Sequence, residues 1–219
     1  MGIGKLAFLA FVDEAVGGAP GRSESERVFR GDYFVSQKLG LGFVKPSAWH
    51  FHAFENFAPM LEGQKLMISS GDDAEDFAEH ASSLVAVISK YPVGVTADED
   101  SNRFSPSITI FQNSEDRDEV ATDFKAAILA GIEHFRELLR GYCVLEAPRF
   151  QMISMCPAVL YTAQFVFEHR ACPPTLVRDR TLAIDQGHHV YSIHLYDSPT
   201  TGEAVGAEFD AFVGSLHLA

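Results

Sequence analysis

The alternation of apolar and polar residues is most regular near the C-terminus, where it predicts a β-hairpin followed by a helix. Between residues 189 and 196, even-numbered side chains would lie on one face and odd-numbered ones on the other, the two-residue period of a strand. Gly187 stands in the turn before this segment, where a positive φ costs glycine little. From 203 to 216, apolar residues recur three or four positions apart, which is typical of an amphipathic helix.

A longer helix is predicted in the middle of the chain. Apolar residues from about 118 to 140 keep the same three- and four-residue spacing, and Gly141 stands where a C-terminal cap would be. A shorter helix is predicted to begin at Asp72, whose side chain could cap the first turn together with Glu75. The acidic residues there would lie at the positive end of the helix dipole.

Short apolar runs rich in β-branched residues predict the strands. Pro148, Pro157 and the pair Pro173–Pro174 separate the later runs, because proline cannot donate to a central ladder. Strands with helices set apart from them indicate an α+β fold, in which one antiparallel sheet is covered by helices. The expected strands are 32–37, 41–44, 65–69, 84–90, 107–111, 143–146, 151–154, 158–169, 175–185 and 189–196.

The chain is expected to form one domain, from 28 to 219, preceded by a lead segment and linker over residues 1–27. Its 219 residues are 47% hydrophobic, enough for a substantial core. The lead segment contains one apolar run, 6–12, which is too short to span a bilayer. Acidic residues follow that run directly, so we expect a first helix or a surface-packed segment and a cytoplasmic protein. An export signal, with a periplasmic location, is the alternative.

The acidic composition narrows the choice of partners. The 30 acidic residues and the 17 lysines and arginines give a formal net charge of −13, which disfavours nucleic acid and anionic lipid surfaces. A basic patch on a protein partner is the complementary choice. The three cysteines show no CxxC spacing, so we interpret them as reduced core thiols and predict neither a disulfide framework nor a zinc site.

Three motifs, in this order, resemble the PsbP/Mog-like superfamily, including its bacterial DcrB-like branch. They are the segment 42–49, which ends in Pro-x-x-Trp; the turn 156–158, which leads into a long strand; and the closing strand 190–193 with the helix after it. The resemblance covers about 32–218. It implies a PsbP/Mog-like α/β/α sandwich, an antiparallel sheet between helices, and a binding, assembly or adaptor role without an established enzymatic activity.

Two segments are candidate binding surfaces. The aromatic segment 49–57 cannot bury every ring if it is extended, because alternate residues of a strand point to opposite faces. The acidic loop between 92 and 106 suits lysines and arginines on a partner, although a solvated loop is the simpler interpretation. The residues concerned are Trp49, Phe51, Phe54 and Phe57 in the first segment and Asp98, Glu99 and Asp100 in the second.

The histidines raise the question of a metal site. His50 and His52 would share one face of a strand, and His188 and His194 could share a face of another, so four imidazoles would meet if the two strands were neighbours. No HExxH, GxSxG or Walker A sequence is present, and we assign no catalytic residue, no metal and no cofactor. Half-exposed structural histidines are the simpler interpretation.

The sequence therefore predicts a non-catalytic protein-binding or adaptor module. We expect its partner to be a protein with a basic or apolar patch. Two alternatives stay open: a small enzyme or metal-binding protein that uses a histidine-rich pocket, and an exported protein that works close to a membrane.

Overall fold

The computed structural model describes residues 28–52, 83–91, 104–114, 123–169, 172–187, 189–199 and 205–219. The longer helices and strands follow the order that the hydrophobic pattern predicts, whereas the short strands Val28–Arg30, His50–Phe51 and His217–Leu218 were not predicted. The elements are β1 (Val28–Arg30), β2 (Tyr33–Ser36), β3 (Leu41–Val44), β4 (His50–Phe51), β5 (Ser83–Ser89), β6 (Ser107–Ser114), α4 (Phe124–Leu138), β7 (Cys143–Ile153), β8 (Cys156–His169), β9 (Cys172–Asp185), β10 (His189–Asp197), α5 (Gly206–Gly214) and β11 (His217–Leu218).

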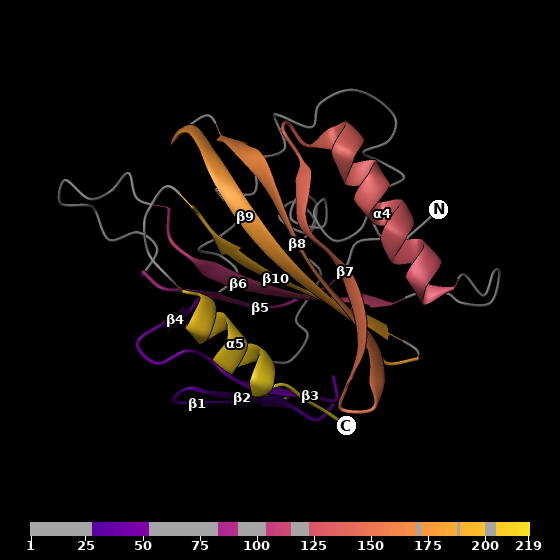
Figure 1. Cartoon of the computed structure of the whole chain (residues 1–219). Helices are drawn as coiled ribbons and strands as arrows, with labels where there is room; N and C mark the ends of the chain where they lie inside the picture. Colours follow the sequence, from indigo (N-terminus) through magenta and orange to yellow (C-terminus); the bar gives the residue numbers. More distant parts are fainter. Residues whose placement is uncertain are drawn as a thin grey trace.

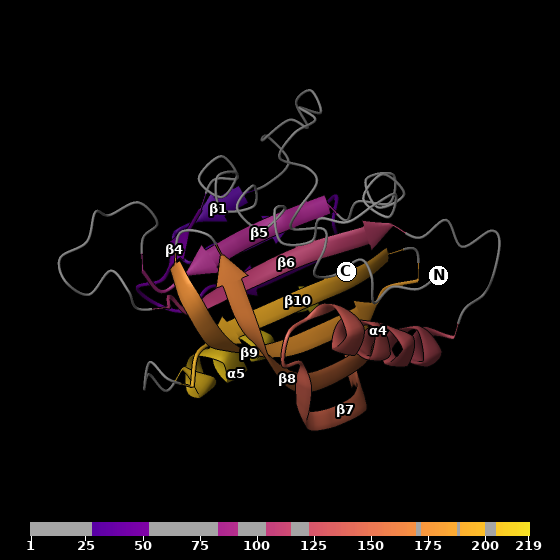
Figure 2. The same ribbon diagram turned by 90° about the horizontal axis from the view of Figure 1, so that it is seen from above.

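The strands form two antiparallel sheets. The large sheet has seven strands in the order β4-β5-β6-β10-β9-β8-β7, and the small sheet has four in the order β1-β2-β3-β11. Helix α4 covers one face of the large sheet, and α5 lies with the small sheet on the other side (Figures 1 and 2). This arrangement confirms the predicted α+β fold, and the separate small sheet corrects the expectation of a single sheet.

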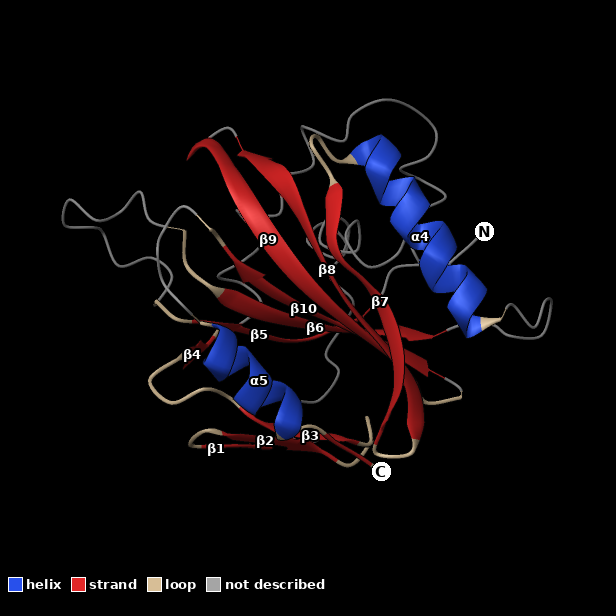
Figure 3. Ribbon diagram, in the orientation of Figure 1, coloured by secondary structure: helices blue, strands red, loops and turns tan. Residues whose placement is uncertain are grey.

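The main core lies between the large sheet, α5 and the small sheet (Figure 3). Aromatic rings fill it: Phe34 and Phe43 stack with centroids 4.7 Å apart, and Phe212 of α5 lies 5.3 Å from Phe43. Phe209 and Phe212 are both buried on one face of α5, as the helical spacing predicts. A second, smaller core lies under α4, where Ile128 and other apolar residues pack on the large sheet.

Helix α4 has a cap at each end, and its C-terminal end lies close to the predicted position. The Asp123 side chain caps its first turn by accepting a hydrogen bond from the Lys125 backbone N–H at 3.1 Å. The helix ends at Leu138, and Gly141 takes a φ of +68° two residues after the C-cap, a conformation that favours glycine. The helix begins at Phe124, later than the predicted beginning near 118, because Asp123 is a non-helical N-cap.

The prediction that prolines separate the late strands is wrong for Pro148, which lies inside β7, whereas Pro157 and Pro173–Pro174 lie just inside the beginnings of β8 and β9. Pro148 lies in the edge strand β7, between Glu146 and Arg149, where the register with β8 shifts. Pro173 and Pro174 lie near the beginning of β9, inside another register shift. Proline is tolerated at edges, strand ends and bulges because no central ladder bond is lost there.

Several predicted elements cannot be compared with the structure. The lead segment 1–27, the strand 65–69 and the helix beginning at Asp72 lie outside the described residues. Within the described part of the chain, neither helix is long and apolar enough to cross a membrane.

Candidate functional site

Trp49 is a core residue. Its side chain is 2% exposed, and its ring lies edge-on to Phe209 with centroids 5.9 Å apart. The indole Nε1–H donates a hydrogen bond to Glu208 Oε1 at 3.1 Å, and Lys90 Nζ lies 3.5 Å from the other oxygen of that carboxylate. Trp49 therefore fastens the segment after β3 to α5.

Phe51 packs against the same core. It is half-buried, its ring lies 6.2 Å from that of Phe43, and Lys45 Nζ lies 5.8 Å from its centroid. The other residues of the two predicted binding surfaces lie outside the described residues: Phe54, Phe57, Asp98, Glu99 and Asp100. The aromatic residues that the structure describes thus contribute to packing.

His52 is held by a short chain of hydrogen bonds. Its Nε2 lies 2.5 Å from Ser89 Oγ, and the Ser89 hydroxyl donates to the Tyr91 carbonyl oxygen. Because the single hydroxyl proton of Ser89 is used there, His52 must be the donor to Ser89. Burial, and then the positive charge of neighbouring His50, lower the pKa of His52. The neutral imidazole is therefore favoured.

The structure does not bring the predicted histidine cluster together. Strands β5 and β6 lie between β4 and β10, so three strand spacings, about 14 Å, separate His52 from His194. His50 is exposed, and His188 lies outside the described residues. Among the described residues, no three side chains of metal-binding type converge on one point.

His194 instead forms a buried pair with Asp179 beneath α4. His194 Nδ1 donates to Asp179 Oδ2 at 2.9 Å, and the Thr181 hydroxyl donates to the same oxygen at 3.1 Å. The side chains of His194 and Asp179 are 1% and 11% exposed. No described residue pairs with Asp179 Oδ1 or His194 Nε2. A substrate cannot reach the pair in this conformation.

Three tyrosines surround this pair. Burial is the main cause of the raised pKa of Tyr161 and of Tyr196, and the negative charge of Asp179 is the second cause. Burial is also the first cause of the raised pKa of Tyr142. The Tyr196 ring stacks on His194 with centroids 5.6 Å apart and planes 8° apart. The cluster is a dense polar layer inside the protein.

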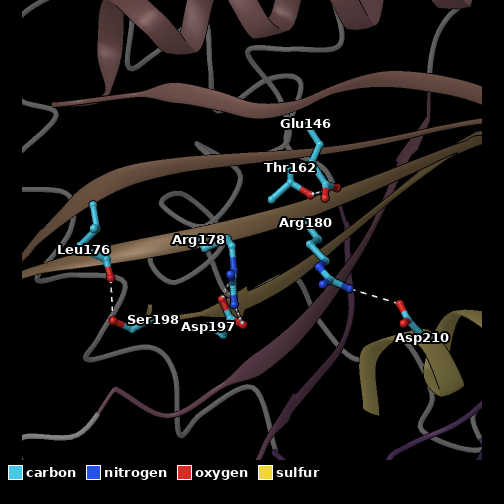
Figure 4. Close-up of polar contacts among 8 residues, drawn as sticks. All are labelled: Glu146, Thr162, Leu176, Arg178, Arg180, Asp197, Ser198 and Asp210. Atoms are coloured by element: carbon cyan, nitrogen blue, oxygen red, sulfur yellow. Dashed lines mark hydrogen bonds and ion pairs between the residues drawn. The ribbon is translucent and has the colours of Figure 1, made fainter. Parts of the chain in front are cut away.

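The opposite face of β9 carries charged residues that are paired with each other (Figure 4). Arg178 forms a two-pronged contact with Asp197, with Nε at 2.7 Å and Nη2 at 2.5 Å from the two carboxylate oxygens. This hydrogen bonding is the main cause of the raised pKa of Arg178. Next to it, the Ser198 hydroxyl donates to the Leu176 carbonyl oxygen at 2.7 Å. These groups tie β9 to β10.

Two further contacts in Figure 4 join neighbouring elements. Arg180 Nη1 lies 3.2 Å from Asp210 Oδ1 and so connects β9 with α5. The Thr162 hydroxyl donates to Glu146 Oε2 at 2.8 Å and connects β8 with β7. The charged groups drawn in Figure 4 therefore all have partners within the chain. None of these described residues points to a ligand.

The hairpin formed by β7 and β8 exposes apolar side chains. Half of the large hydrophobic side chains that are exposed in the described part of the chain belong to it. The exposed fractions are 48% for Leu145, 41% for Phe150, 62% for Met152 and 91% for Met155. We call these four residues the hairpin edge. Several exposed apolar side chains on one hairpin are a candidate interaction surface.

The turn of this hairpin places Met155 at its tip. Both turn residues have positive φ, 46° for Ser154 and 65° for Met155. Two-residue hairpin turns of this kind favour Asn-Gly, because side chains other than glycine and asparagine lose about 1 kcal/mol or more in the left-handed region. The chain therefore maintains a costly backbone conformation that holds a large apolar side chain in solvent. Strain of this kind points to a functional role.

Strand β7 is also an edge of the large sheet, so one side of its backbone faces outward (Figure 2). Ile153 pairs with Cys156 directly across the two-residue turn, and Met152 pairs with Pro157. In such hairpins the pair next to the turn is hydrogen-bonded and the following pair is not. The backbone groups of Met152 and Phe150 therefore point away from β8, and Pro157 opposite Met152 fits this alternation.

Sequence reasoning missed the hairpin edge. It predicted strands at 143–146 and 151–154 but did not identify either as an edge strand. One signal was present: Phe150, Met152 and Met155 are apolar residues within six positions, next to Arg149 and close to Pro148. Proline near a strand end favours an edge position.

The sequence alone matches no model of a protein family. No curated protein matches it either.

Solved structures give the class of the fold. The solution structure of cyanobacterial PsbP (CyanoP) from Synechocystis sp. PCC 6803 superposes with a TM-score of 0.51 at 12% identity, over 93% of this chain and 99% of that one. LpqN of Mycobacterium tuberculosis, described as involved in cell envelope biogenesis, gives 0.46 at 11% identity over 82% and 83%. A Pseudomonas aeruginosa protein of unknown function, PA94, gives 0.43 at 15% identity over 59% and 76%.

The likeness to CyanoP extends over nearly the whole of both chains. At 12% identity it concerns the fold alone. The chain therefore has a PsbP-like α+β fold, as the three sequence motifs predict.

Proposed function

We propose that this chain is a non-catalytic protein-binding module that contacts its partner through the hairpin edge. The observation that carries the proposal is Met155, which is 91% exposed at the tip of a turn with two positive φ values. An exposed side chain on a strained turn has no folding role, so a binding role is the simplest reason for both.

The chemistry of the hairpin edge suits a protein surface. Methionine is flexible and polarisable, so Met152 and Met155 can fit into an irregular apolar pocket and contact aromatic rings. Covering one such side chain contributes about 1.5–3 kcal/mol. Lys125 of α4 lies 4.8 Å from the Phe150 centroid, and this cation–π contact holds the ring in place next to the outward backbone.

The arrangement of the titratable groups supports a role without catalysis. The His194–Asp179 pair is sealed under α4, and the charged residues on the opposite face of the sheet are paired with each other. Because Trp49 is buried, we assign the contact surface to the hairpin edge instead of the aromatic segment 49–57. Asp98, Glu99 and Asp100 stay candidates for a second contact, with a basic patch on the partner.

The proposal also covers the branch of the superfamily that the chain resembles and the cellular compartment of the protein. We place the chain with the Mog-like and DcrB-like proteins on the sequence motifs 42–49 and 156–158. The acidic residues after the apolar run 6–12 favour a cytoplasmic protein, and an exported protein is the alternative. Mass spectrometry of the N-terminus of the protein from its native cell separates the two.

A photo-reactive amino acid tests the contact surface. It is placed at position 155, and in a matched protein at position 138, an exposed leucine on α4. We expect a discrete cross-linked product from position 155 only. An excess of the unmodified chain should suppress a product with another protein, or be incorporated into a dimer, whereas an excess of the Met152→Asp variant should do neither. Equal suppression by both competitors, or the same products from position 138, would contradict the proposal.

A further inference from the structure

The outer edge of β7 has a short stretch of backbone groups that could pair with another strand, and this stretch is limited at both ends. Residues Arg149 to Ile153 pair one-to-one with β8, so their alternation is regular, whereas the register shifts between Glu146 and Arg149. Pro148 closes this regular stretch on one side because it has no N–H, and the turn at Ser154 closes it on the other. A long strand from another protein would meet the bulge and Pro148. A segment of the same length fits.

A second copy of β7 has that length. If two copies run antiparallel about a two-fold axis through Gln151, Phe150 of one lies opposite Met152 of the other, and Arg149 lies opposite Ile153. Phe150 and Met152 are the residues whose backbone groups point outward, so this pair and its symmetry mate fall on hydrogen-bonding positions, whereas the Arg149–Ile153 pairs do not. Gln151 faces itself on the axis at a position without backbone bonds. The backbone alternation is thus self-complementary.

The same two-fold axis brings apolar side chains of the two copies together. Phe150 and Met152 lie on the α4 side of the sheet, so each ring would meet the thioether of the second copy, a favourable contact. Met155, in the turn, and Leu145, at the register shift, flank the paired stretch at its two ends. The pairing itself would cover Phe150 and Met152. The two Arg149 side chains stay four residues, about 13 Å, apart.

We propose that the occupant of the hairpin edge is a second copy of this chain, paired antiparallel along β7 about Gln151. This inference rests on the proposed function and names its partner. The exposed ladder from Arg149 to Ile153 and the hairpin edge together form one isologous surface, the kind on which two-fold dimers are built. Each copy carries a net charge of −13, so added salt strengthens the association by screening that repulsion.

Sedimentation equilibrium of the purified full chain measures the association over a roughly hundred-fold range of concentration. We expect a reversible monomer–dimer equilibrium that shifts toward the dimer as salt is added. Met152→Pro removes an outward N–H but leaves the ladder with β8, since Pro157 already occupies the opposite position. The loss occurs twice in the symmetric dimer, and the Met152 thioether is lost with it, so the dissociation constant should rise at least about ten-fold. Leu138→Asp, the matched control on α4, should leave it unchanged.

Disulfide trapping tests the register. In a chain with Cys143, Cys156 and Cys172 replaced by serine, Gln151→Cys puts two thiols on the axis, where facing Cα atoms lie about 4.5 Å apart, within disulfide range. Arg149→Cys in the same background puts them about 13 Å apart. We expect the first variant to form a covalent dimer at least about ten-fold faster than the second.

Two results would overturn the inference. One is a chain that stays monomeric over the whole concentration range, and the other is equal oxidation of the two cysteine variants. If the chain is monomeric while the probe at position 155 captures a different protein, the second-copy inference fails and the proposed function stands. If the probe yields neither a covalent dimer that incorporates the unmodified chain nor a product with another protein that the unmodified chain suppresses, both fail.

Discussion

His194 of β10 and Asp179 of β9 share a hydrogen bond of 2.9 Å, and both side chains are buried. His194→Ala would leave the Asp179 carboxylate without its imidazole partner in a buried position. We expect a loss of about 3–5 kcal/mol in the free energy of unfolding, measured by urea denaturation.

The matched control for that pair is Asp210→Ala, which breaks the ion pair with Arg180. The Asp210 side chain is 80% exposed, so solvent screens the interaction and the change should stay within about 0.5 kcal/mol. Similar losses in both variants would contradict a special role for the buried pair.

Tyrosine ionisation should occur late in the folded protein. Four of the six tyrosines have raised pKa values, and burial raises that of Tyr191 to about 12. Because the folded pKa lies above the unfolded value of 10.0, this contribution to stability is complete below pH 10 and is lost as the pH rises further.

A titration followed at 295 nm checks this. We expect tyrosines 142, 161, 191 and 196 to ionise only as the protein unfolds in alkali, and all six to ionise together near the ordinary value in urea. A single transition for all six in the folded protein would contradict the burial of these hydroxyls.

Trp49 is the only tryptophan in the chain, so its fluorescence reports directly on the segment after β3. With 2% of the residue exposed, we expect blue-shifted emission that acrylamide hardly quenches. Trp49→Ala should cost about 3–5 kcal/mol in the free energy of unfolding because it leaves a cavity next to Phe209. Red-shifted, quenchable emission would instead support an exposed binding residue.

The turn at the tip of the β7–β8 hairpin should be suboptimal for stability. Replacing Ser154 by Asn and Met155 by Gly supplies the residues that tolerate positive φ, and we expect a gain of about 1 kcal/mol together with weaker association. Gly141→Ala is the control: φ there is +68° and the added methyl would meet only Val166 at 3.5 Å, so backbone strain should cost about 1 kcal/mol. A loss of stability in the turn variant would refute the strain argument.

The periodic parts of the sequence predicted the fold well. The hairpin into β10 and the apolar face of α5 depend on local spacing, and the structure reproduces both. The ends of β7, β8 and β9 could not be predicted, because bulges and edge positions that accommodate Pro148 and Pro174 arise only when neighbouring strands pair.

The candidate site was harder to predict, since exposure is a property of the assembled sheet. Met155 and Ile153 are both large apolar residues two positions apart, yet Met155 projects from a turn and Ile153 packs against the core. The histidines illustrate the reverse error. His52 and His194 do share one face, but only the strand order shows that two strands lie between them.

Strand β11 bears on how the protein is made. It pairs with β3, with His217 opposite Gly42, so the small sheet joins residues from near the two ends of the described chain. Phe34 and Phe43 are synthesised before the large sheet, whereas Phe212, which lies against Phe43, and β11 are synthesised after it. The N-terminal meander therefore presents an apolar face and an unpaired edge until the large sheet and α5 have been synthesised, so this region must fold late.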